Sequence, residues 1–113
     1  MHELSLAEDM RDLILEKAEK DGFRKVEKVW LEVGELACVE ASAMEFCFSA
    51  VMAGTPAQGA KLEIISIPGE GECHQCHHRW RVQELYDCCP ECGSFGARII
   101  QGREVRVKSI SVI

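Results

Sequence analysis

Two pairs of cysteines constrain the fold of this 113-residue chain more than any other feature. Cys73-His-Gln-Cys76 and Cys89-Pro-Glu-Cys92 are both Cys-x2-Cys motifs, and twelve residues separate them. Each motif forms a tight turn, called a knuckle here, that points two sulfurs at one centre. Two facing knuckles complete a tetrahedral site of four thiolates, which is the geometry that structural zinc prefers. The sequence therefore predicts a zinc ribbon with Cys73, Cys76, Cys89 and Cys92 as the ligands.

Three further cysteines lie outside this set of ligands. Cys88 is an alternative ligand to Cys89, but a Cys-x3-Cys spacing makes a poorer knuckle, so we interpret Cys88 as a spare thiol. Cys38 and Cys47 are interpreted as packing residues, because free cysteines are often buried as small hydrophobic groups. The role of Cys88 stays open.

Three histidines, His74, His77 and His78, crowd the first knuckle. Four thiolates already fill a closed tetrahedron, so we interpret these histidines as solvent-exposed residues. The alternative is a weak secondary site for a soft or borderline cation. The sequence leaves their role open.

The residues outside the cysteine segment predict two helices. Ser5-Leu-Ala-Glu8 is a capping box with Ser5 as the N-cap, and the apolar periodicity continues as far as Asp21-Gly22. Ser42 and Glu45 form a second capping box, and that helix ends near Gly54. The predicted apolar positions are Leu6, Met10, Leu13, Ile14 and Ala18 in the first helix, and Ala43, Phe46, Cys47, Ala50 and Val51 in the second.

Three segments predict strands. In residues 28–33 the aliphatic side chains of Val29, Leu31 and Val33 alternate with Lys28, Trp30 and Glu32, which indicates one buried face. In residues 62–67 and 105–112 the alternation slips by one position, so each strand is either covered on two faces or contains a bulge. We expect the strands over 62–67 and 105–112 to pair antiparallel, with the cysteine segment inserted between them. The prediction is an α+β fold with a small mixed three-stranded sheet, two helices and an inserted zinc-ribbon module of four cysteines.

Charge and sequence pattern argue against several classes of function. Thirteen basic and nineteen acidic side chains give a formal net charge of −6, whereas a phosphate backbone requires a basic face. We expect no membrane span, because no apolar run approaches about 20 residues. No export signal is apparent, so the expected compartment is the cytoplasm, where thiols stay reduced. No Ser/His/Asp set, phosphate-binding glycine loop or open zinc site is apparent, so we do not expect an enzyme.

The first residues offer a possible chelate. The α-amine of Met1, the backbone nitrogen of His2 and the His2 imidazole can close on one small cation. If Ser5 caps the first helix, Met1, His2 and Glu3 precede it as a solvent-facing arm. The alternative is a disordered chain end without a function, which is the usual condition of chain ends.

Taken together, these features resemble the HypA/HybF family. The resemblance rests on Met-His-Glu-Leu-Ser at residues 1–5, Val-Gly-Glu-Leu at residues 33–36 and the paired Cys-x2-Cys motifs, and it covers essentially the whole chain. Members of that family are nickel metallochaperones for the maturation of [NiFe]-hydrogenases. The resemblance implies a nickel-binding α/β domain over 1–69 and 96–113, with a zinc-binding domain over 70–95 inserted before the last strand. Cys88 departs from the family pattern.

The resemblance also implies two metal sites. It places the nickel site on Met1, His2 and Glu3, and structural zinc on the four cysteines of the knuckles. The Met1 amine, the deprotonated His2 amide and the His2 imidazole form fused chelate rings, and the Glu3 backbone nitrogen is a candidate fourth donor. Four nitrogens in a plane suit Ni(II) or Cu(II), whereas zinc prefers a tetrahedron.

The implied partners are a nickel-handling GTPase of the HypB type and the hydrogenase large-subunit precursor. Some relatives serve urease maturation instead, and the sequence does not distinguish the two. A rival hypothesis is a zinc-ribbon adaptor between proteins that binds no transient metal and is indifferent to His2. A third and weaker rival is a nucleic-acid-binding ribbon.

Overall fold

The chain forms two compact units. The computed structural model describes residues 2–113, so Met1 lies outside the described residues. The first unit consists of residues 2–31, 39–64 and 107–113, and the second consists of residues 32–38 and 65–106. Both helices belong to the first unit, and all four cysteines of the knuckles belong to the second.

Helix α1 spans His2–Asp21, so it begins three residues before the predicted N-cap. The prediction of a solvent-facing arm is therefore wrong for His2 and Glu3, and it falls outside the described residues for Met1. The Ser5 hydroxyl donates backwards to the carbonyl of His2 at 3.1 Å, and an N-cap would instead accept from an N–H ahead of it. Ser5 is thus a residue of the first turn.

The far end of α1 follows the prediction. Its buried face does so only in part, because Ala7 was not predicted and the predicted positions Leu6, Leu13 and Ala18 are half-buried. Gly22 has a φ of 78° and donates its N–H to the carbonyl of Ala18 at 2.8 Å, so a left-handed glycine ends the helix. Ala7, Met10 and Ile14 are buried. In the described part of the chain, neither helix is long and apolar enough to cross a bilayer.

Helix α2 spans Ala41–Val51, and its cap and its buried face both differ from the prediction. Glu40 is the N-cap, because its carboxylate accepts from the N–H of Ala43. Met44, Cys47 and Phe48 are buried, whereas Phe46 is 75% exposed. The apolar residues of this helix cover nearly its whole circumference, so periodicity alone admits more than one buried stripe.

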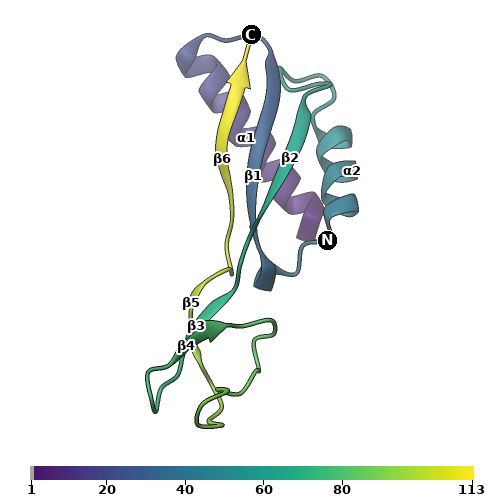
Figure 1. The fold of residues 1–113 in the computed structure, drawn as a ribbon. Helices are drawn as coiled ribbons and strands as arrows, with labels where there is room; N and C mark the ends of the chain where they lie inside the picture. The colour runs from purple at the N-terminus through teal and green to yellow at the C-terminus, as the bar shows by residue number, and fades with distance from the viewer. Residues whose placement is uncertain (1) are drawn as a thin grey trace. The chain divides into compact units, whose positions relative to one another are not determined.

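A mixed three-stranded sheet has the order β2-β1-β6, with β1 at Val26–Gly34, β2 at Lys61–Ile67 and β6 at Val105–Val112. Figure 1 shows β1 and β2 running in one direction and β6 in the other, with α1 crossing one face. The predicted pairing of β2 with β6 is wrong, because β1 lies between them. The physical reason is that β1 alone is rich in fully buried residues and takes the central position: Val26, Val29, Leu31 and Val33.

Hydrogen bonds at both ends of β1 join it to the segment that contains β6. The N–H of Ile113 donates to the carbonyl of Lys25 at 3.0 Å in the first unit. The N–H of Gly34 donates to the carbonyl of Glu104 at 2.9 Å in the second unit. A Cβ on Gly34 would lie 2.1 Å from the carbonyl oxygen of Gly102, so this close backbone approach requires glycine.

A second three-stranded sheet, absent from the prediction, supports the cysteine module. Its order is β4-β3-β5, with β3 at Glu70–Glu72, β4 at Arg79–Arg81 and β5 at Arg98–Gln101. Both pairings are antiparallel. The Glu72 carboxylate bonds Arg79 at 3.2 Å and Arg98 at 3.1 Å, so one side chain of β3 holds both neighbours. Strands this short and polar carry too little periodicity to be predicted.

Candidate metal centres

The four cysteines of the knuckles converge on one point. The sulfurs of Cys73, Cys76, Cys89 and Cys92 all lie within 4.8 Å of one another. The Sγ atoms of Cys73 and Cys92 are 3.4 Å apart, and those of Cys76 and Cys89 are 3.6 Å apart. A zinc–sulfur bond of about 2.3 Å gives a tetrahedron with an edge of about 3.8 Å. The donor set and its spacing therefore fit structural zinc.

The two knuckles repeat one hydrogen-bonding pattern. The N–H of Cys73 donates to the carbonyl of His78 at 2.9 Å, and the N–H of Cys89 donates to the carbonyl of Ser94 at 3.0 Å. In the first knuckle the N–H of His77 also donates to the carbonyl of Cys73. In the second knuckle the N–H of Gly93 donates to the carbonyl of Cys89 in the same way. In both knuckles the first cysteine is buried and the second is exposed.

Both knuckles contain a left-handed residue at the same position. Gly93 has a φ of 77°, and His77 has a φ of 62°. A side chain costs roughly 1–2 kcal/mol in this conformation, so the first knuckle carries strain that the second does not.

The surroundings shift the pKa values of two thiols of the cluster in opposite directions. Ser94, through its hydroxyl 3.2 Å from the sulfur and through its N–H, lowers the pKa of Cys92 to about 6. The N–H of His78 lowers the pKa of Cys76, but desolvation and the neighbouring sulfurs outweigh it and raise that pKa to about 12. Desolvation and the neighbouring sulfurs thus oppose ionisation of Cys76, whereas a bound cation favours it.

The other sulfur and imidazole groups of the second unit lie outside this cluster. Cys88 is exposed, and the structure brings Cys89 rather than Cys88 to the cluster. His74 and His77 are exposed, whereas His78 is half-buried and its ring stacks on Trp80 at a centroid distance of 6.2 Å. In residues 2–113 no histidine joins a group of three or more potential ligands.

The two cysteines of the N-terminal half differ from each other. Cys47 is buried in α2, which confirms its interpretation as a packing residue. Cys38 is exposed, so the same interpretation is wrong for it. Cys38 follows the short 3-10 helix Glu35–Ala37 in a left-handed conformation with a φ of 58°. Its contribution to the fold is therefore the backbone turn that ends this helix.

At the start of α1, the side chains of the two described residues of the predicted nickel site have different contacts. The side chain of His2 is exposed, and its imidazole makes no hydrogen bond or ion pair to any residue in the range 2–113. The carboxylate of Glu3 instead accepts a hydrogen bond from the backbone N–H of Glu40 at 3.1 Å. This bond lowers the pKa of Glu3 more than any other contact does.

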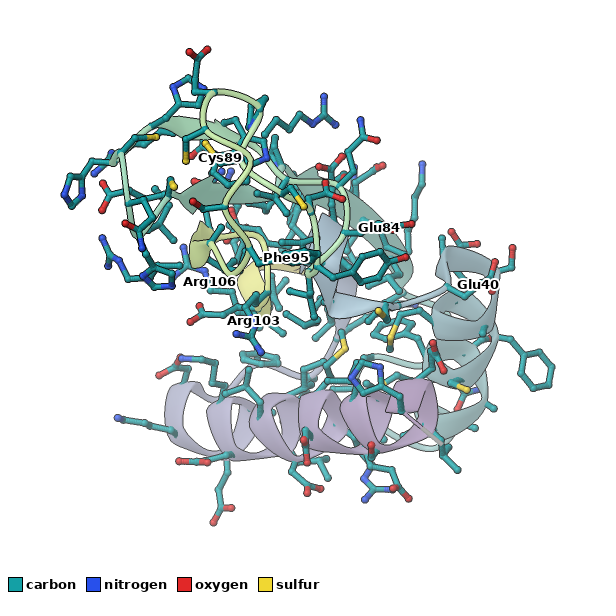
Figure 2. The ribbon with its side chains drawn as sticks, turned by 90° about the horizontal axis from the view of Figure 1, so that it is seen from below. Glu40, Glu84, Cys89, Phe95, Arg103 and Arg106 are labelled. Atoms are coloured by element: carbon teal, nitrogen blue, oxygen red, sulfur yellow. The ribbon has the colours of Figure 1, made fainter. Side chains whose placement is uncertain are left out.

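Glu40 is a functional candidate that sequence reasoning missed. It caps α2 with its carboxylate and holds Glu3 with its N–H, and Figure 2 shows it at the start of that helix. The only signal in the sequence is a carboxylate just before an apolar helical run. Ser42 masked that signal, because serine followed by Glu45 matches the preferred capping pattern better.

Comparisons with known proteins identify one family. The family of hydrogenase/urease nickel incorporation metallochaperones, hypA, matches residues 1–112. The hydrogenase maturation factor HypA of Azotobacter chroococcum mcd 1 is 45% identical over 112 residues, covering 99% of each chain. The maturation factor HybF of Klebsiella pneumoniae is 46% identical over 110 residues, covering 97% of each chain.

Two solved structures share the fold. A solution structure of a HypA protein gives a TM-score of 0.74 at 30% identity, covering 100% of this chain and 97% of that one. The solution structure of the Ni metallochaperone HypA from Helicobacter pylori gives a TM-score of 0.71 at 28% identity, covering 98% of this chain and 97% of that one.

A small α+β protein with a four-cysteine metal module is the class that the fold and site define. The chain belongs to the HypA/HybF family of hydrogenase maturation factors. Its relatives are maturation factors and metallochaperones rather than enzymes, and they support a nickel metallochaperone role in hydrogenase maturation.

Proposed function

We propose that this protein binds Ni(II) through Met1, His2 and Glu3 and delivers the ion during [NiFe]-hydrogenase maturation. The observation that carries the proposal is the exposed His2 imidazole, which makes no hydrogen bond or ion pair to the described residues. A neutral imidazole in water is an available ligand for a divalent transition metal. The family and the names of the relatives supply the identity of the ion.

The position of His2 at the start of a helix suits this chemistry. The first four N–H groups of an α-helix have no intrahelical acceptor, so metal binding at the amides of His2 and Glu3 breaks no helical hydrogen bond. In the proposed site these two nitrogens, the imidazole and the Met1 amine surround nickel in a plane. A planar set of four nitrogens selects Ni(II) over zinc.

The contact between Glu3 and Glu40 gives the side chain of Glu3 a structural role that is distinct from metal binding. Its carboxylate is already bonded to the Glu40 N–H, so we assign its backbone nitrogen, and not its side chain, to nickel. A cation at a helix N-terminus is opposed by the macrodipole, at a cost of about 0.3–1 kcal/mol. The carboxylates of Glu3 and Glu40 supply negative charge at this end and offset that cost.

The zinc module has a structural task in this proposal. Zinc held by Cys73, Cys76, Cys89 and Cys92 stabilises a domain over residues 70–95, inserted into a nickel-binding domain over 1–69 and 96–113. The segment contains few buried aliphatic side chains, Val82 among them, so metal binding supplies most of its folding free energy.

Delivery requires release to an acceptor. A site at an exposed helix end is open to solvent on several sides, so an acceptor can replace its ligands one at a time. We propose a HypB-type nickel GTPase and the hydrogenase large-subunit precursor as the two partners in this exchange. We place the exchange in the cytoplasm, before any export of the mature enzyme.

Extension of the N-terminus tests this proposal against the zinc-ribbon adaptor. Two residues added before Met1 convert its amine into an amide and move the new amine away from the imidazole. Nickel affinity should then fall steeply although every side chain is present, and the diamagnetic square-planar spectrum should be lost. Acid should act similarly, because protons compete for the same nitrogens. An extended protein that binds nickel with unchanged affinity and spectrum would exclude the amine.

A further inference from the structure

The cysteine module exposes three large apolar side chains. Leu85 is 46% exposed, Tyr86 is 69% exposed and Phe95 is 75% exposed. All three lie within eleven residues of the second unit. Isolated exposed apolar residues are ordinary, but a group of them on so small a module is a feature of interaction surfaces.

A hydrogen-bonded turn presents Leu85 and Tyr86. The Asp87 carboxylate accepts from the N–H of Gln83 at 3.1 Å and from the N–H of Glu84 at 3.3 Å. The N–H of Asp87 donates back to the carbonyl of Glu84 at 3.1 Å. The Glu84 carboxylate raises the pKa of the Tyr86 hydroxyl. Because hydrogen bonds already hold the backbone of this turn, binding of a partner would cost little further conformational entropy there.

Phe95 follows the second knuckle in the sequence, whereas the turn that contains Leu85 and Tyr86 precedes it. The turn ends two residues before Cys89, and Phe95 directly follows Ser94, whose carbonyl accepts from the N–H of Cys89. Glu84, Cys89 and Phe95 are labelled in Figure 2. The second knuckle therefore anchors both parts of the exposed apolar group, which we call the apolar tip (Leu85, Tyr86 and Phe95).

The segment that carries the apolar tip contains negative charge only. No lysine, arginine or histidine occurs between Arg81 and Arg98, whereas three carboxylates do: Glu84, Asp87 and Glu91. Zinc held by four thiolates would add a net charge of −2. A nucleic acid or an anionic membrane would be repelled, and a second copy would bring the same negative segment against itself.

We propose that the apolar tip is a docking surface for a protein partner with an apolar pocket bordered by lysine or arginine. Tyr86 and Phe95 are the kind of aromatic side chain that supplies most of the affinity of an interface, and the carboxylates match a basic rim. This surface goes beyond the proposed function, because it involves no nickel ligand.

Selection from a displayed random-peptide library tests the proposal, with the zinc-loaded protein as the target. The selected peptides should combine lysine or arginine with leucine or aromatic residues. Synthetic copies should bind Tyr86→Ser and Phe95→Ser variants at least about tenfold more weakly than the parent, as fluorescence anisotropy would measure. Their affinity should also fall with added salt.

Phe46→Ser is the matched control, because Phe46 is also 75% exposed but lies in α2 of the first unit. It should bind the peptides like the parent, and zinc content together with far-UV circular dichroism should show that each variant is folded. Equal loss of affinity in the Phe46→Ser variant, or unchanged binding by both tip variants, would overturn the proposal. Concentration-dependent self-association of the parent that both tip variants abolish would assign the surface to a second copy and also overturn it.

Discussion

The carboxylate of Glu3 accepts a hydrogen bond from the backbone N–H of Glu40 at 3.1 Å, across 37 positions of sequence. This bond joins the first turn of α1 to the N-cap of α2. The residue next to His2 is therefore part of a folded structure, and the two described residues of the proposed nickel site, His2 and Glu3, lie at the start of α1. Donors on a helical backbone, as His2 and Glu3 would supply, differ from donors on a free arm, because less ordering remains to be done when the metal binds.

Two substitutions of Glu3 distinguish the role of its side chain as a hydrogen-bond acceptor from the role of its negative charge. Glu3→Gln keeps an oxygen that can accept from the Glu40 N–H, whereas Glu3→Ala does not. We expect faster hydrogen exchange at the Glu40 amide and fraying of the first turn of α1 in Glu3→Ala, with smaller changes in Glu3→Gln. Amide exchange followed by NMR measures this. Equal exchange rates in the parent and in Glu3→Ala would contradict the anchoring role.

His77 and Gly93 occupy equivalent positions of the two knuckles, so opposite substitutions should have opposite effects. His77→Gly relieves a left-handed side chain and should stabilise the zinc-bound module by up to about 1 kcal/mol. Gly93→Ala should destabilise it by about 1–2 kcal/mol through backbone conformation alone, because a Cβ at Gly93 meets no atom within 4 Å. Competition with a chelator measures both. Tighter zinc binding in Gly93→Ala would show that the φ values do not matter.

Sequence patterns correctly predicted those parts of the fold for which the pattern is compatible with only one local structure. Gly22 ends α1 and the alternation of β1 buries one face, because turn chemistry and period-2 spacing leave little choice there. The convergence of the four cysteines follows the same logic, since two Cys-x2-Cys turns facing one another have one common centre.

The failed predictions concern choices that tertiary contacts decide. Ser5 satisfied a capping rule, but Glu3 has a partner 37 positions away, so the helix begins earlier. Phe46 was predicted for the apolar stripe of α2, but the structure buries Phe48 and exposes Phe46, and α2 packs against α1. Strand order depends on pairing between distant segments, which short apolar runs do not encode. The proposed nickel ligands have no spacing pattern at all, and only family resemblance indicated them.

Replacement of the zinc ligands should have a local effect. Serine at Cys73, Cys76, Cys89 or Cys92 should abolish tight zinc binding and unfold residues 70–95. The helices should persist, because their buried side chains belong to the first unit. Zinc content and far-UV circular dichroism measure the two effects. Cys88→Ser is the matched control, and it should keep about one zinc per chain. If the Cys89→Ser variant kept its zinc and the Cys88→Ser variant lost it, then Cys88 and not Cys89 would be the zinc ligand.

Glu35 should make the second unit sensitive to acid. Its carboxylate is bonded to Arg81 and to the N–H of Gly69, and these contacts lower its pKa in the folded state, with Arg81 the larger cause. Because the folded pKa is the lower one, this stabilisation is complete above the ordinary glutamate pKa of about 4.5 and is lost as pH falls through the folded value.

The amide resonance of Gly69 reports this titration directly. Its chemical shift should move with a midpoint below that of an ordinary glutamate. A Glu35→Gln variant should show no such transition in that range. A midpoint at or above the ordinary value would contradict the bonding of Glu35.

Nickel titration of the native protein beside a His2→Ala variant tests the central claim most directly. Both proteins must begin at Met1 without a tag, and isothermal titration calorimetry with simultaneous zinc analysis gives affinity and zinc content. Our account predicts that His2→Ala loses strong nickel binding while zinc content and far-UV circular dichroism stay unchanged, because the imidazole makes no hydrogen bond or ion pair within the described chain. Nickel binding by His2→Ala with the affinity of the parent would contradict the N-terminal site.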